Sequence, residues 1–402
     1  MTSVAAEESL LEGPGRKQAP ETPKLVRVAR EHGVGPFRQL GQILSLMVKR
    51  RGLHPSEYYD FELYHPRYTA KERAQFLGTK GSRRLNIRRL SPKKSKLHFD
   101  LLDDKPMCGS LLSGLGLRGT ETQAIVSVIR SFGNLPVLRD VEAIYHYFTQ
   151  DARYPVFAKP VSGSLSVGSV LIEGVGADGS TLILGNGETV AMHDFALEVL
   201  AKHGRGGFLL QSAVRQHPKL TEVAGPALGT IRVVTVPEEE AHPRTLYVLW
   251  KIPSPQAMSD NFWQDGSMLA NVDLETGEVL SCRKGTGPDT AQIETHPVTG
   301  QPILGLRLPF WSEVKTLAEQ AHAIFPKAGV IGWDIGLSED GPVIVEANTA
   351  PFHTLYQLAT GEGIMNSRFA PVFEKIAVRQ AALSRKKKAG RKTESDAGRA
   401  TI

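Results

Sequence analysis

The chain has 402 residues, 41% of them hydrophobic and 22% charged, which is ordinary for a globular protein with one large core or two or three smaller ones. No apolar run reaches the length of about 18 residues that a membrane-spanning helix needs, and the 2 cysteines are too few for a disulfide framework or a thiolate metal cage. Much of the net charge of +6 lies in residues 83–96 and 385–392, with no nucleic-acid-binding signature beside them, so we expect no nucleic-acid partner.

The two ends of the chain are polar and lack a periodic apolar face. We therefore predict that residues 1–24 and 384–402 are disordered tails, the second of them basic. The first residues show no basic start followed by an apolar block, so no secretory signal is expected and the prediction is a cytoplasmic protein.

Residues 25–102 follow the first tail, and their apolar spacing is helical. A dense group of aromatic residues at 58–64 is typical of packing against a neighbouring domain. The sequence thus predicts a mostly helical N-terminal region, in which one helix carries an apolar stripe made of Leu40, Ile43, Leu44 and Met47.

From about residue 103 strands mix with helices. One helix is predicted to begin at Asp103-Asp104, whose side chains can cap it, and to end near Gly114 or Gly116, with Lys105 in its first turn. Strands joined in part by short turns and mixed with helices predict an α+β fold over residues 103–383. The predicted helices are 192–203 and 311–325, and the predicted strands are 156–158, 169–172, 182–184, 208–211, 231–236, 246–252 and a pair within 330–346.

The most informative segment runs from Gly329 to Asn348 and reads as two strands joined by a turn at 338–342. Because side chains alternate between the two faces of a strand, Asp334, Glu346 and Asn348 should share one face. The opposite face should carry the residues Trp333, Ile335, Leu337, Val343, Val345 and Ala347.

The register of this hairpin decides whether the polar groups meet. A tight turn at Asp340-Gly341 would place Pro342 in the ladder, where it cannot donate a hydrogen bond. An odd-length loop centred on Asp340 instead sets Asp334 opposite Glu346. Two facing carboxylates are destabilising unless a cation lies between them, and oxygen ligands of this kind suit Mg²⁺ or Mn²⁺. An ordinary solvated hairpin would fit the same pattern.

A second candidate segment begins at Lys159, which ends a short strand and is followed by a loop rich in serine and glycine at 161–169. Backbone N–H groups of such a loop can approach phosphate oxygens closely, and the lysine can add a point charge. The loop leads into another strand, so it is neither a Walker A motif nor a GxGxxG turn that opens a helix. A plain hairpin turn is the alternative.

In this order the segments resemble the ATP-grasp superfamily, specifically its sugar-transfer-associated, glutamate-ligase-like branch, over about residues 36–380. The resemblance implies an ATP-grasp fold, in which two α+β halves clasp ATP. The matching segments are Asp104-Lys105 with its helix, Phe157 to Gly168, Gly207 to Gln211, Gly229 to Thr235, Ser259 to Phe262, Asn271 to Gly277, His296 to Gly300, Leu308 to Trp311, and the D…ExN pattern of the hairpin.

The resemblance also implies roles for individual residues. Arg232 would act on the transferred phosphoryl group, and Lys105 and Lys159 would hold the α- and β-phosphates. One or two Mg²⁺ (or Mn²⁺) ions would be bound by Asp334, Glu346 and Asn348. Further nucleotide contacts would come from Ser162, Gly163, Ser164, Gly168, Gln211, Asn261 and His296.

Each candidate has an ordinary alternative that the sequence leaves open. Arg232 would fit a surface ion pair, Lys105 an exposed helix start, and Gln211 the edge of a strand. His296, in a segment with proline and glycine, would fit a turn. Lys251 ends a strand and is left unassigned.

The resemblance implies an ATP-dependent ligase. Such an enzyme phosphorylates a small acidic substrate at its carboxylate and passes the acyl group to an amine or similar nucleophile, here in surface polysaccharide or amino-sugar metabolism. Two alternatives are a phosphotransferase on the same scaffold and a non-catalytic nucleotide-binding partner of a glycan-assembly complex. No residue pattern identifies the substrates or the oligomeric state.

Overall fold

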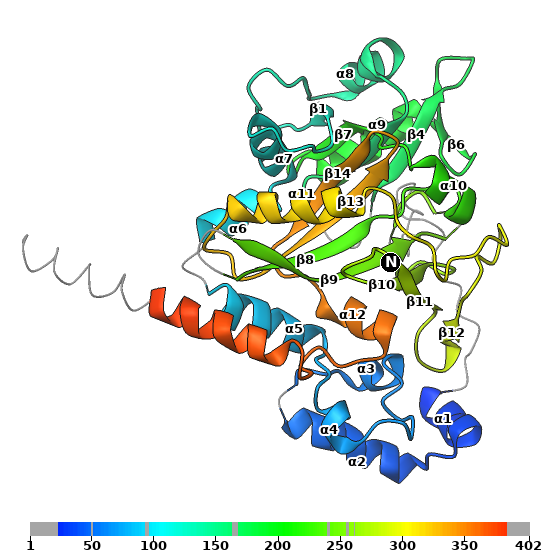
Figure 1. Ribbon diagram of the computed structural model, residues 1–402. Coiled ribbons are helices and arrows are strands. Elements are labelled where there is room, and N and C mark those ends of the chain that lie inside the picture. The colour runs from blue at the N-terminus through cyan, green and yellow to red at the C-terminus, as the bar shows by residue number, and fades with distance from the viewer. Residues whose placement is uncertain are drawn as a thin grey trace, which may run out of the picture.

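The computed structural model describes residues 23–49, 51–92, 96–162, 168–238, 242–254, 257–260 and 262–383. The predicted tails, 1–24 and 384–402, lie outside these ranges except for Pro23 and Lys24, and Lys24 begins the first helix. Two seven-stranded sheets and a helical N-terminal region make up the described chain (Figure 1). None of the helices in the described ranges is long and apolar enough to cross a bilayer.

The N-terminal region is helical, as its spacing predicts. Its aromatic residues at 58–64 are buried in one core with residues of the second sheet and of α12 (His353–Thr360), so the region packs directly on that sheet. Its elements are α1 (Lys24–His32), α2 (Pro36–Val48), α3 (Pro55–Asp60), α4 (Ala70–Arg73), α5 (Thr79–Arg84), a π-helical turn (Leu85–Leu90) and α6 (Lys96–Asp103).

The predicted apolar stripe of α2 is mostly not part of this core. Ile43 is buried, but Leu40, Leu44 and Met47 are exposed. A polar side chain sets the phase of the helix: the amide of Gln39 is buried and donates to backbone carbonyls 3.1 Å and 2.6 Å away in the preceding segment. A buried amide must keep such partners, and this fixes which side of α2 faces inward.

The first sheet has the order β2-β1-β7-β3-β4-β5-β6 and is antiparallel except for the pair β1–β2. Helices α8 (Val141–His146) and α9 (Met192–His203) pack on one of its faces, with Val156 and Ala158 of β3 beneath them. The strands are β1 (Thr122–Val126), β2 (Val137–Leu138), β3 (Val156–Pro160), β4 (Val170–Val175), β5 (Thr181–Leu184), β6 (Thr189–Ala191) and β7 (Phe208–Ser212).

The second sheet has the order β12-β11-β10-β9-β8-β13-β14 and is antiparallel throughout. Alternate residues of β8 face opposite cores: Ile231 and Val233 pack with α11 (Trp311–Ala323), whereas Val234 and Val236 pack with α12 and the N-terminal region. The strands are β8 (Ile231–Pro237), β9 (Pro243–Ile252), β10 (Met268–Val272), β11 (Val279–Lys284), β12 (Ala291–Gln292), β13 (Ile331–Ser338) and β14 (Gly341–Asn348).

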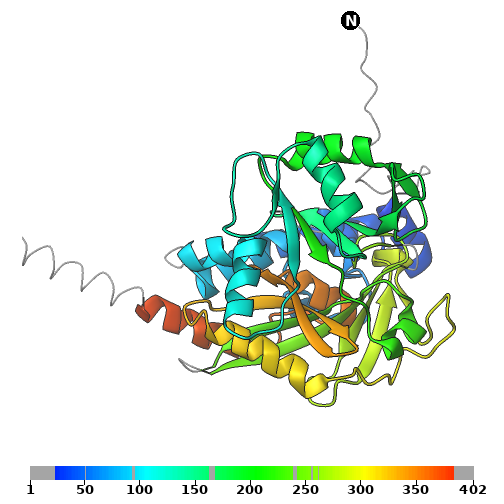
Figure 2. The same ribbon diagram turned by 90° about the horizontal axis from the view of Figure 1, so that it is seen from above.

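Two further helices precede the strands of the first and the second sheet in the chain order. The predicted helix at the start of the α+β region is α7 (Lys105–Gly114), capped by the side chain of Asp104, and α10 (Pro218–Ala224) lies between the two sheets in the chain order. Figure 2, a view from above, shows α9 (green) and α11 (yellow) at opposite edges of the molecule, with strands between them.

Candidate active site

One cavity of about 560 Å³ lies between the two sheets. The first sheet contributes residues of β3, β4 and β7, the second sheet contributes residues of β8, β9, β13 and β14, and the N-terminal region and α12 close one end. The residues that line the cavity include Thr79, Lys105, Lys159, Gln211, Thr230, Arg232, Lys251, Asp260, Asp334, Val345, Glu346, Asn348, Phe352, Thr354 and Leu355.

The carboxylate hairpin is present as β13 and β14, and Asp334 pairs with Glu346 as predicted. The predicted odd-length loop is wrong, however. Ser338 pairs with Gly341 across a tight turn, and such a turn alone would set Asp334 opposite residue 345. A β-bulge after Asp334 shifts the register by one residue and restores the pairing.

Because of the bulge, the predicted apolar face of β14 is partly wrong. Ile344 and Ala347 pack in the same core as Trp333, whereas Val345 lines the cavity. The backbone carbonyl of Val345 lies 3.4 Å from Nζ of Lys159. An inserted residue reverses the alternation on one side of the bulge, so Val345 and Glu346 both reach the cavity.

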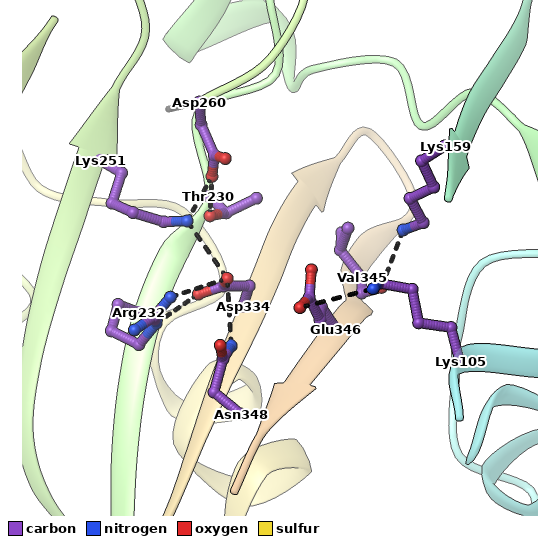
Figure 3. A network of polar contacts seen from close by, with 10 residues as sticks. All are labelled: Lys105, Lys159, Thr230, Arg232, Lys251, Asp260, Asp334, Val345, Glu346 and Asn348. Atoms are coloured by element: carbon purple, nitrogen blue, oxygen red, sulfur yellow. Dashed lines mark hydrogen bonds and ion pairs between the residues drawn. The ribbon is translucent and has the colours of Figure 1, made fainter. Parts of the chain in front are cut away.

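Asp334 is buried and is surrounded by cationic and amide groups (Figure 3). Arg232 donates to its two oxygens from Nε (2.5 Å) and Nη2 (2.9 Å), and Lys251 donates from Nζ at 3.1 Å. The amide nitrogen of Asn348 lies 3.4 Å from the same carboxylate. Burial by itself would raise the pKa of Asp334, but Arg232 and Lys251 hold that pKa well below its ordinary value, so the carboxylate is ionised.

Lys251, which the sequence left unassigned, bridges two carboxylates. Its Nζ lies 2.8 Å from Asp260 and 3.1 Å from Asp334, and Asp260 also accepts a hydrogen bond from the hydroxyl of Thr230. Burial would lower the pKa of Lys251, but the two carboxylates raise it above its ordinary value. The sequence feature that could have revealed this bridging role is a lysine within the apolar strand β9, because a buried ammonium group requires a partner.

The other wall of the cavity carries two lysines close to Glu346. Nζ of Lys105 lies 4.0 Å from Glu346 and 3.2 Å from the carbonyl of Val161. Lys159 is 5% exposed, and burial lowers its pKa to about 8 even though Glu346 partly opposes this. Figure 3 shows both lysines directed toward β14 from the first sheet and α7. Their combined charge makes this side of the cavity a site for an anion.

Two buried polar atoms at the cavity lack partners. Within the described part of the chain, nothing donates to Oε1 of Gln211, whose amide nitrogen donates to the hydroxyls of Thr120 and Thr122. In the same ranges Nη1 of Arg232 has no acceptor. Buried polar atoms are normally satisfied, so these two are available to a ligand in the cavity.

The N-terminal region holds the loop that follows Asn348. The side chain of Asn86 donates to the carbonyl of Pro351 (2.8 Å), and Ser82 accepts from the backbone N–H of His353 (3.1 Å). The ring of His353 lies 2.8 Å from Asn86, and burial lowers its pKa to about 3, so the ring is neutral. We call this set of contacts between Ser82, Asn86 and residues 351–353 the N-terminal clamp.

The family model described as "Sugar-transfer associated ATP-grasp" matches residues 84–371. The chain belongs to this ATP-grasp family. The expected ATP-grasp fold, with its helical N-terminal region, is thereby confirmed.

Solved structures show more distant likenesses. The D-alanine–D-alanine ligase of Coxiella burnetii has 12% identity and a TM-score of 0.43, with 76% of this chain and 64% of that chain covered. The corresponding ligase of Bacillus anthracis has 13% identity and a TM-score of 0.39, covering 74% and 72%. The biotin carboxylase domain of a 2-oxoglutarate carboxylase from Hydrogenobacter thermophilus, solved with MgADP, has 13% identity and a TM-score of 0.37, covering 69% and 46%. No curated protein matches this chain by sequence.

Some predicted nucleotide-binding residues of this ATP-grasp chain are not at the cavity. His296 is buried in a turn, where its Nδ1 accepts from the backbone N–H groups of Val298 and Thr299, in agreement with the turn alternative. Ser162 is exposed and Gly168 is buried beside Pro160, and neither lines the cavity. The predicted residues Gly163, Ser164 and Asn261 lie outside the described ranges.

The remaining oxygen donors fit a hydrated divalent cation. Among the described residues no three His, Cys, Asp or Glu side chains form a metal cluster, so a cation here would use two carboxylates and an amide oxygen. Glu346 faces the cavity with 29% of its side chain exposed, and Oδ1 of Asp334 accepts one hydrogen bond, from Arg232. Mg²⁺ commonly takes one or two carboxylates and completes its shell with water and phosphate oxygens. Glu346, Asp334 and Asn348 are therefore the residues that would hold such a cation.

Proposed function

We propose that this ATP-grasp protein is a ligase that uses Mg²⁺-ATP to activate a carboxylic acid. In this reaction a carboxylate oxygen of the substrate forms a bond to the γ-phosphorus, and the bond from that phosphorus to ADP breaks. An amine then attacks the resulting acyl phosphate at carbon, inorganic phosphate leaves, and the amine loses a proton. The products are an amide, ADP and phosphate.

The observation that carries the proposal is the placement of opposite charges around one cavity. Lys105 and Lys159 face Glu346 from one wall, and Arg232 lies across from them with Nη1 directed to no acceptor in the described chain. A triphosphate needs cationic groups along its length, whereas a carboxylate beside it needs a bound cation. The two lysines and Arg232 support the first part of the proposal, and Glu346, Asp334 and Asn348 would hold the cation.

Each residue has a physical task in this proposal. Lys105 and Lys159 neutralise phosphate oxygens at a buried position, where charge interactions are weakly screened. Asp334 holds the guanidinium of Arg232 by two hydrogen bonds, which fixes the direction of Nη1 toward the moving phosphoryl group. Gln211 would accept a hydrogen bond from the nucleotide base through Oε1. A bound Mg²⁺ would supply charge neutralisation at the phosphates, held by Glu346, Asp334 and Asn348.

The proposal extends to the class of substrate. The family description names sugar transfer, and we infer that the acid or the amine belongs to surface polysaccharide or amino-sugar metabolism. Uronic acids and amino sugars are the matching chemical classes.

The test is a trapping experiment with hydroxylamine as a small amine. The protein is incubated with Mg²⁺-ATP, hydroxylamine and pools of amino acids, hydroxy acids or uronic acids, and both ADP and hydroxamate are measured. A hydroxamate formed in step with ADP supports the ligase. A stable phosphorylated product without hydroxamate would instead indicate a phosphotransferase, and ATP that is bound but never consumed with any pool would indicate a non-catalytic nucleotide-binding protein.

A variant and a control sharpen this test. Glu346→Gln keeps the shape of the side chain but removes the charge that a cation needs, so hydroxamate formation should fall about 100-fold. Arg307→Leu removes an exposed ion pair with Glu278 away from the cavity and should leave the reaction unchanged.

A further inference from the structure

Helix α2 exposes a continuous apolar surface. Five of the 18 large hydrophobic residues that are exposed in the described chain lie on this one helix. They recur at intervals of three and four residues, which places them along one side of the helix. We call them the α2 stripe: Phe37 (90% exposed), Leu40 (47%), Leu44 (60%), Met47 (50%) and Val48 (81%).

The sequence around the stripe carries charge of one sign. Residues 33–52 contain four basic residues and no acidic residue. Two of the basic residues, Arg38 and Lys49, are exposed and directly follow Phe37 and Val48, so they lie along one edge of the stripe. The opposite edge continues into the buried residue Ile43. A basic edge beside exposed phenylalanine and leucine is typical of a helix that lies in the plane of a membrane interface.

The alternative of a second copy of the chain fits these observations less well. A symmetric pair of α2 helices would bring Arg38 and Lys49 of both copies to the same interface, where like charges repel. An anionic lipid surface attracts these same charges instead.

The position of α2 leaves the cavity accessible. Figure 1 shows α2 at the opposite end of the molecule from the first sheet. The stripe also lies outside residues 84–371, which the family model matches. A surface bound at α2 would therefore be remote from the opening between the sheets.

We propose that the α2 stripe docks this protein on an anionic lipid bilayer. The apolar side chains enter the boundary between headgroups and acyl chains, and Arg38 and Lys49 contact lipid phosphates. This docking does not depend on the proposed ligase activity, because none of the residues involved lines the cavity.

The test is co-sedimentation of the full chain with two kinds of vesicle: phosphatidylcholine alone, and phosphatidylcholine with an equal part of phosphatidylglycerol. We expect binding to the anionic vesicles that weakens as salt is added, and much weaker binding to the zwitterionic ones. The double variant Phe37→Ser/Leu44→Ser should reduce the anionic binding at least tenfold, and Arg38→Gln/Lys49→Gln should reduce it several-fold. The matched control Leu280→Ser/Val298→Ser changes exposed residues elsewhere and should bind like the natural chain.

Three results would overturn the proposal. One is the absence of binding to either vesicle. Another is anionic binding that survives Phe37→Ser/Leu44→Ser, because the basic run at 385–392 would then be responsible. The last is a dimer in light scattering that the same double variant converts to a monomer, since the stripe would then be an interface between copies. Circular dichroism and thermal melting of each variant verify that the fold is retained.

Discussion

Lys159 should give the proposed ATP site a pH dependence that an ordinary lysine would not. Burial lowers its pKa to about 8, so a rise in pH through this value removes the positive charge of Lys159 from the cavity. A group with this pKa is about 90% protonated at pH 7 and about 10% protonated at pH 9. If the phosphates bind the protonated form, the dissociation constant of Mg²⁺-ATP should rise about tenfold over this range, or about 1.4 kcal/mol. An exposed lysine, with a pKa of about 10.4, would produce almost no change.

The measurement is titration calorimetry with a non-hydrolysable ATP analogue at pH 7, 8 and 9, with salt and magnesium held constant. Lys159→Met should bind the analogue more weakly at pH 7 and should lose the pH dependence, because the titrating amine is gone. The nucleotide's own titration affects both proteins equally and cancels in the comparison. Lys202→Met, which changes a lysine on α9 paired with Glu198, should keep the dependence. A flat profile for the natural chain, or a tenfold change that persists in Lys159→Met, would refute the reasoning.

Three further predictions concern the cavity and the N-terminal clamp. Glu346→Gln should reduce the turnover of Mg²⁺-ATP by about 100-fold, while calorimetry without magnesium should show nucleotide affinity within a factor of about three of the natural value. Arg232→Leu should lower the free energy of unfolding in urea by about 3–5 kcal/mol, because Asp334 stays buried with one cation fewer. The control Arg307→Leu removes an exposed ion pair and should lower it by less than about 1 kcal/mol. Equal effects of the two variants would contradict this account. Asn86→Ala should cost about 1–3 kcal/mol by leaving buried polar groups without partners, and an unchanged urea midpoint would count against the clamp.

The hairpin shows how a sequence can predict a contact for the wrong reason. The alternation of polar and apolar residues correctly brings Asp334 and Glu346 together. The turn and the bulge are not visible in that alternation, because a two-residue turn with a bulge and a three-residue loop without one give the same pairing. The sides of residues 343–345 distinguish them: Ile344 rather than Val343 packs in the core with Trp333, and Val345 lines the cavity. Aliphatic side chains such as these are compatible with both a core and a cavity wall.

The partners of Asp334 could not be predicted from the same pattern. Arg232 reaches Asp334 because β8 pairs with β13, although about 100 residues of chain separate the two strands. The chain order gives no sign of this pairing. The phase of α2 could not be predicted for a related reason: apolar spacing identifies one side of the helix, but the buried amide of Gln39 decides which side faces the core.

The N-terminal clamp joins the N-terminal region to the loop after Asn348, and both parts contribute to one end of the cavity. Most of the charged residues stand on strands of the two sheets and on α7. Thr79, Phe352, Thr354 and Leu355 form the less charged end and come from the N-terminal region and the segment that it holds. Under the proposed function, substrate choice can therefore change through residues such as Thr79 and Phe352 while the residues proposed for phosphoryl transfer stay the same. Selectivity would then depend on the N-terminal region and the segment that it holds, and reactivity on the strands of the two sheets and on α7.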